Sequence, residues 1–125
     1  MPDCEANSRL CVLFPGIGYT CDKPLLYFTA ALARSLGYIT RPVLYGGFPP
    51  KVRGDASRLR ESYELAQAQA EKLLGDIDWR RYDQPIFVGK SIGTAVAARY
   101  ASEHELQARF VLLTPLRETF LYPCP

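Results

Sequence analysis

Ser91 stands between two glycines in the pentapeptide Gly89-Lys90-Ser91-Ile92-Gly93, which follows the apolar run 85–88. A serine in that position can occupy a sharp, strained turn from a strand into a helix, because larger neighbouring side chains would collide with the backbone. Its hydroxyl then points outward, beside the first amides of the helix. The pattern predicts that Ser91 is a nucleophile. A glycine-rich stretch of this length can also be a simple connection, so the rest of the chain has to decide.

A second glycine-containing loop, residues 15–18, follows the apolar run 10–14. Acyl transfer passes through a tetrahedral oxyanion, which needs two preorganised N–H donors beside the nucleophile. We expect one donor to be the amide of Ile92, directly after the serine. The second would come from the 15–18 loop, where Gly16 and Gly18 let the backbone come close to a substrate.

Four further residues lie near these two loops in the sequence. Lys90 could attract an anionic substrate, although a lysine at a tight turn can also be a solvated charge. Tyr19 and Thr20 would shape the entrance to the site. Cys21 could line a pocket, but without a basic partner its thiolate fraction should be low.

Apolar runs alternate with helical patterns along the whole chain. Strands are predicted at residues 10–14, 39–45, 85–88 and 110–114, and helices after Asp22, across the middle of the chain and over residues 92–102. Asp22 is the expected cap of the first helix, and Gly37 its end. Such alternation predicts a parallel sheet with right-handed crossovers and helices on both faces, a three-layer α/β/α sandwich.

The middle helix carries one apolar stripe, which we expect to face the core. A coiled coil would need a similar spacing, but a helix packed on a sheet accounts for it equally well in an alternating chain. The stripe consists of Leu59, Tyr63, Ala66, Ala70, Leu73 and Ile77.

Length and composition set the broad class of the protein. The 125 residues, 48% of them hydrophobic, are enough for one core, so we expect a single domain over residues 1–125. A net charge of +2 with interspersed signs indicates no nucleic-acid surface. The chain has no run of membrane-spanning length and no signal-peptide pattern, so we expect a cytoplasmic protein without membrane contact. Four cysteines without CxxC spacing and a single histidine predict neither metal nor cofactor.

Two nucleotide-binding motifs are partly matched. Gly89-Lys90-Ser91 has the ending of a Walker A motif, but Gln84 stands where its first glycine belongs, and a strand occupies the place of its phosphate loop. The loop at Gly16 lacks the third glycine of a dinucleotide fingerprint, and the second strand ends without an acidic residue. Nucleotide binding is therefore the least favoured function.

Together, the two loops resemble those of the α/β-hydrolase superfamily, over residues 10 to about 116. Residues 13–18 look like its oxyanion loop, with Pro15 in place of a histidine, and residues 88–93 look like its nucleophile elbow. The resemblance implies a partial α/β-hydrolase fold of about four strands in the order 2-1-3-4. It also implies that the main-chain N–H of Ile17 is the second oxyanion donor and that a small acyl compound is the substrate.

In that family the acid and the histidine follow later strands, and we expect this chain to lack that carboxy-terminal part. The only histidine, His104, should lie roughly 20 Å from Ser91 along the helix and serve as an exposed helix-end residue. We therefore expect an esterase or thioesterase site whose acid and base come from elsewhere. The alternative is a non-catalytic module that forms a homo-oligomer or pairs through its exposed sheet edge.

Overall fold

Strands and helices alternate along the residues that the computed structural model describes, 9–16, 19–46 and 56–115. The strand expected at 39–45 runs instead from Tyr38 to Pro42, and the Val43 amide directly after it still donates to the carbonyl oxygen of Leu13, at 2.9 Å. The elements follow one another as β1 (Arg9–Phe14), α2 (Pro24–Ser35), β2 (Tyr38–Pro42), α3 (Ala56–Leu73), a short 3-10 helix η1 (Trp79–Arg81), β3 (Ile86–Lys90), α4 (Ile92–Glu103) and β4 (Arg109–Leu113).

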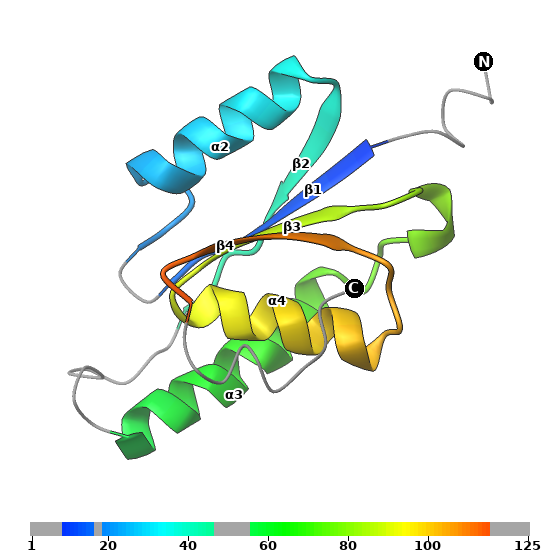
Figure 1. Ribbon diagram of the computed structural model, residues 1–125. Coiled ribbons are helices and arrows are strands. Elements are labelled where there is room, and N and C mark those ends of the chain that lie inside the picture. The colour runs from blue at the N-terminus through cyan, green and yellow to red at the C-terminus, as the bar shows by residue number, and fades with distance from the viewer. Residues whose placement is uncertain (1–8, 17–18, 47–55, 116–125) are drawn as a thin grey trace.

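All four strands are parallel and form one sheet in the order β2-β1-β3-β4. Helix α2 covers one face, and α3 and α4 cover the other (Figure 1). The chain steps one way from β1 to β2 and the opposite way from β2 to β3 and β4. A single hand of crossover then places α2 opposite the other two helices. The predicted three-layer α/β/α fold is confirmed.

The core has two parts because successive side chains of a strand point to opposite faces. Cys11 and Leu13 of β1 pack under α2, and Val12 and Phe14 pack under α3 and α4. Cys11 is buried as expected for a small apolar side chain, and burial raises the pKa of its thiol to about 11. Nearly the whole of β1 is buried, as the sequence predicted for a strand covered on both faces.

The apolar stripe of α3 faces the core for most of its predicted length. Ala66 and Ala70 are fully buried, but Leu73 is 38% exposed and Leu74 is only 1% exposed. Leu74 takes the position expected for Leu73 because it follows Ala70 by four residues, the nearer match to 3.6 residues per turn. α3 packs beside α4 in the same layer and joins it through an Arg99–Glu64 ion pair of 3.1 Å.

The sheet also fixes where a site can form. The order of the strands reverses between β1 and β3, because the helices that follow these two strands lie on opposite faces of the sheet, and in such sheets ligands bind outside the carboxyl ends of the strands at this point. Phe14 pairs with Gly89 at that end of the sheet. The loop after β1 and the turn after β3 therefore emerge side by side.

Candidate functional site

Ser91 alone connects β3 to α4. Its backbone has φ 57° and ψ −120°, a region that L-residues rarely occupy and that costs about 1–3 kcal/mol. Because β3 ends at Lys90 and α4 begins at Ile92, no loop separates the strand from the helix. The sharp, strained turn predicted at Ser91 is present, and the junction has no room for a phosphate-binding loop.

Both glycines of the pentapeptide are required by close backbone packing. A Cβ atom on Gly89 would lie 2.7 Å from the Cα of Thr94, and one on Gly93 would overlap the carbonyl oxygen of Phe14. These neighbours are backbone atoms that cannot rotate away. The first turn of α4 therefore packs directly on the ends of β3 and β1, and this contact holds Ser91 in its turn.

Hydrogen bonds fix the same turn from two sides. The amide of Ser91 donates to the carbonyl oxygen of Leu113 in β4, at 2.9 Å. Its carbonyl oxygen accepts from both the amide and the hydroxyl of Thr94, at 3.0 and 2.6 Å, and Thr94 is fully buried. Sequence reasoning missed Thr94 and Leu113. Thr94 could have been found from its place three residues after the serine, but Leu113 has no local signal because its contact depends on sheet register.

Ile92, whose amide we expect to be an oxyanion donor, lies at the N-terminal end of α4. It is the first residue of α4, and the first amides of a helix have no acceptor within it. The positive end of the helix dipole lies at the same place and favours negative charge.

The loop after β1 packs directly against the turn at Ser91. A Cβ atom on Gly16 would lie 3.3 Å from the Cβ of Ser91 and 3.0 Å from the carbonyl oxygen of Lys90. Two backbone hydrogen bonds between Gly16 and Tyr19 close this loop, at 3.0 and 3.3 Å. Ile17 and Gly18, the other expected site residues, lie outside the described residues.

Lys90 and Tyr19 form one side of the site. The Nζ atom of Lys90 donates to the hydroxyl of Thr114 at 2.9 Å and lies 4.7 Å from the centre of the Tyr19 ring. The Tyr19 hydroxyl accepts from the amide of Leu25 at 2.9 Å, which fixes the ring. Within residues 9–16, 19–46 and 56–115, no carboxylate forms an ion pair with Lys90. Its charge is held by β3, β4 and the loop after β1.

His104 lies at the opposite end of α4 and is held there. It follows the helix as its C-cap, and α4 is 12 residues or about 18 Å long. Its Nε2 atom lies 2.7 Å from a carboxylate oxygen of Glu71, and its ring stacks on Tyr100 with centroids 4.1 Å apart. This is the helix-end position that the sequence predicted, with a Glu71 contact that it did not.

The expected capping role of Asp22 is wrong. Lys23 is the residue before the first turn of α2 and its side chain makes no capping hydrogen bond, whereas the Leu25 amide in that turn donates to the Tyr19 hydroxyl. Asp22 instead accepts a hydrogen bond from the hydroxyl of Thr20, which is the main reason that the pKa of this carboxyl is lowered. Pro24 removes one of the amides that a capping carboxylate would otherwise satisfy.

Gly16, Tyr19, Lys90, Ser91 and Ile92 are thus brought together at one end of the sheet. Within the part of the chain that the structure describes, no cluster of histidine, cysteine or carboxylate side chains could hold a metal ion.

The same part contains no helix that is both long and apolar enough to cross a bilayer. No known family, curated protein or solved structure matches the chain significantly.

Proposed function

We propose that this chain carries the nucleophile and the oxyanion hole of a serine esterase or thioesterase of the α/β-hydrolase type. The observation that carries the proposal is the backbone of Ser91. It is held at φ 57° between a strand and a helix, by two glycines that tolerate no side chain. Strain of this kind persists only where the surroundings enforce it, and it is concentrated at functional sites.

In the proposed reaction, the Ser91 oxygen attacks the acyl carbon and gives its proton to a general base. The carbonyl oxygen of the substrate takes up the negative charge, which the amides of Ile92 and Ile17 stabilise. Collapse of this intermediate breaks the bond to the alcohol or thiol, which leaves with a proton. Water then releases the acid from the acyl enzyme by the same route.

The charge on Lys90 bears on which substrates this site would favour. Among the described residues its Nζ atom contacts a hydroxyl and an aromatic ring and no carboxylate, so it can still attract an anion. We infer that an acyl compound with a negative group near the reacting bond is bound better than a neutral one.

The proposal requires a base and an acid that the described residues do not place at Ser91. His104 contacts Glu71 through its Nε2 atom at the other end of α4, far from Ser91. The mechanism therefore depends on groups from another segment or another chain, and without them the serine hydroxyl is a weak nucleophile at neutral pH.

A fluorophosphonate probe tests the proposal, because it modifies only an activated serine. The protein expressed from its complete reading frame should be labelled at Ser91, and Ser91→Ala should remove the label. Ser102→Ala, at the other end of α4, is the matched control and should leave labelling intact. An unlabelled wild-type protein would contradict the hydrolase function.

A second candidate is a module that associates with another copy and performs no chemistry. The favouring observation is a group of large apolar side chains exposed on α2 and on the edge strand β4. In this case Ser91→Ala leaves the association unchanged. A monomer measured by size-exclusion chromatography with light scattering would contradict it. These side chains are Leu25, Phe28 and Leu32 on α2, Leu36 directly after it, and Val111 on β4.

A further inference from the structure

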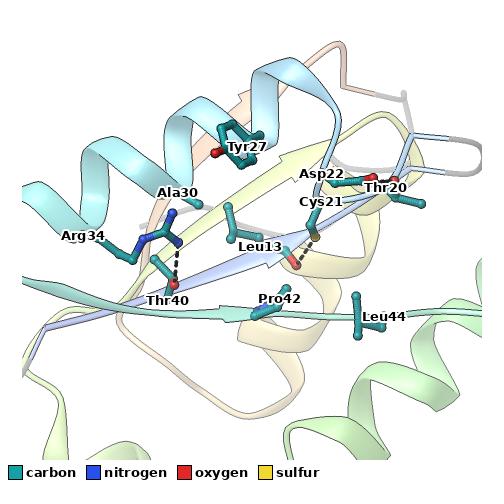
Figure 2. Close-up of a pocket in the computed structure, with 10 residues that line it drawn as sticks. All are labelled: Leu13, Thr20, Cys21, Asp22, Tyr27, Ala30, Arg34, Thr40, Pro42 and Leu44. Carbon is teal, nitrogen blue, oxygen red and sulfur yellow. Dashed lines mark hydrogen bonds between the residues drawn. The ribbon is translucent and has the colours of Figure 1, made fainter.

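A cavity of about 350 Å³ lies between α2 and the edge strand β2 (Figure 2). Its size falls within the range of pockets that bind small ligands. None of its lining residues is Ser91, Gly16, Tyr19 or Lys90, the residues brought together at the site above, although Thr20 and Cys21 directly follow Tyr19 in the chain. The lining residues are Leu13, Thr20, Cys21, Asp22, Tyr27, Ala30, Arg34, Thr40, Pro42 and Leu44.

The middle of the cavity is apolar and its two ends are polar. Leu13 and Ala30 form the buried side, and Pro42 and Leu44 of the β2 segment lie across from them. Figure 2 shows Arg34 and Thr40 at one end, and Thr20, Cys21 and Asp22 at the other. A ligand that fills this space needs an apolar body.

Arg34 supplies the only positive charge among the described residues that line the cavity. One of its terminal nitrogens donates to the hydroxyl of Thr40 at 3.3 Å, and no carboxylate among the described residues pairs with it. A guanidinium group has five N–H donors and matches a carboxylate in a two-bond fork. The hydroxyl of Thr40 accepts from Arg34, so its own proton is free to point at the same anion.

The opposite end disfavours a negative group. The Thr20 hydroxyl lowers the pKa of the Asp22 carboxyl, which is therefore ionised at neutral pH and repels a second anion. The thiol of Cys21 lies within hydrogen-bonding range of the carbonyl oxygens of Leu13 and Val43, at 3.9 and 4.0 Å. Burial raises the pKa of this thiol to about 11, so the group is uncharged at pH 7.

We propose that the cavity binds an aliphatic carboxylate, with its carboxylate on Arg34 and Thr40 and its chain over Leu13 and Ala30 towards Cys21. The volume of about 350 Å³ lies at the small end of the range for ligand pockets, which suits an aliphatic chain of medium length. The charge at each end sets the direction of the ligand, and the apolar middle sets its chemical class.

Isothermal titration of the full chain with decanoate, decylamine and acetate tests this proposal. Decanoate should bind, and decylamine and acetate should bind at least tenfold more weakly, because one lacks the anion and the other the chain. Arg34→Gln should weaken decanoate binding at least tenfold, Arg34→Lys less, and Ser91→Ala not at all. Lys72→Gln, an exposed cation on α3, is the matched control. Equal binding of decanoate and decylamine, or unchanged binding by folded Arg34→Gln, would overturn the proposal.

A second measurement reads the cavity directly through its thiol. In a variant with Cys4→Ser and Cys124→Ser, iodoacetamide should modify Cys21 before the buried Cys11. Saturating decanoate should slow that modification severalfold, and it should not do so after Arg34→Gln. Modification at the same rate with and without decanoate would place the ligand elsewhere and contradict the proposal.

Discussion

The unusual backbone of Ser91 is maintained by contacts that neighbouring residues make with each other. Gly93 packs against the carbonyl oxygen of Phe14. Thr94 donates two hydrogen bonds to the carbonyl oxygen of Ser91, one from its amide and one from its hydroxyl. These contacts fix the start of α4 and the end of β3, which leaves a single residue to make the turn. The strain therefore resides in the nucleophile candidate itself.

Ser91→Gly measures that strain. Glycine occupies positive φ without a steric penalty, whereas alanine meets the same penalty as serine. We expect Ser91→Gly to be more stable than Ser91→Ala by roughly 1 kcal/mol in urea unfolding, although both lose the hydroxyl. Equal stability of the two variants would show that the turn carries no strain.

At the scale of elements, the sequence predicted every strand and long helix but few of their mutual contacts. The alternation of apolar runs with helical stripes is local, so β1 to β4 and α2 to α4 could be recognised from spacing. The strand order was an inference from resemblance, and the structure confirms it. The contacts of Ser91 with Leu113, of Lys90 with Thr114 and of His104 with Glu71 join distant residues, and no spacing rule encodes them.

The candidate site was predictable to a similar extent. Glycine at 89 and 93 and serine at 91 indicate a tight turn, because the backbone packs too closely there for larger side chains at the two glycine positions. The capping role given to Asp22 was wrong because α2 begins one residue later, after Lys23, and the Asp22 carboxylate accepts from the Thr20 hydroxyl instead. Lys90 was ambiguous for a related reason: whether a lysine is solvated or anchored depends on residues that only the fold brings near.

Helix α2 exposes an apolar flank that gives the association candidate its own prediction. Phe28 is 66% exposed and Leu32 is 60% exposed, and contiguous apolar surface is more common at interfaces than on monomers. If a second copy covers this flank, Leu32→Glu should convert the oligomer into a monomer, because it buries a charge in the contact. Glu61→Gln, at an exposed position on α3, is the control and should leave the molar mass from light scattering unchanged. A Leu32→Glu protein with the wild-type molar mass would exclude this flank as the contact.

At the scale of the whole molecule, the buried thiols make stability depend on alkaline pH. Burial raises the pKa of both Cys11 and Cys21 from about 9 to about 11. Between these values the unfolded chain loses thiol protons that the folded chain keeps, so stability is complete below about pH 9 and falls as the pH rises towards 11. Burial also raises the pKa of Tyr45 and Tyr100, which adds a loss in the same direction above pH 10.

Urea unfolding at several pH values from 8 to 11 checks this dependence. Cys21→Ala should lose stability less steeply over that range than the wild type. Cys4→Ser is a control for the general effect of removing a thiol. A stability that stays level up to pH 11 would contradict the burial of these groups.

The hydrogen bond from Ser91 to Leu113 has a consequence for synthesis on the ribosome. β1, α2 and β2 leave the exit tunnel first and can pair at once, because their partners are close in sequence. Ser91 emerges later, but its amide still lacks its acceptor, the Leu113 carbonyl oxygen, because Leu113 belongs to the last described strand. A nascent chain therefore acquires its sheet in stages, and the geometry at Ser91 is completed only after β4 has been translated and docked.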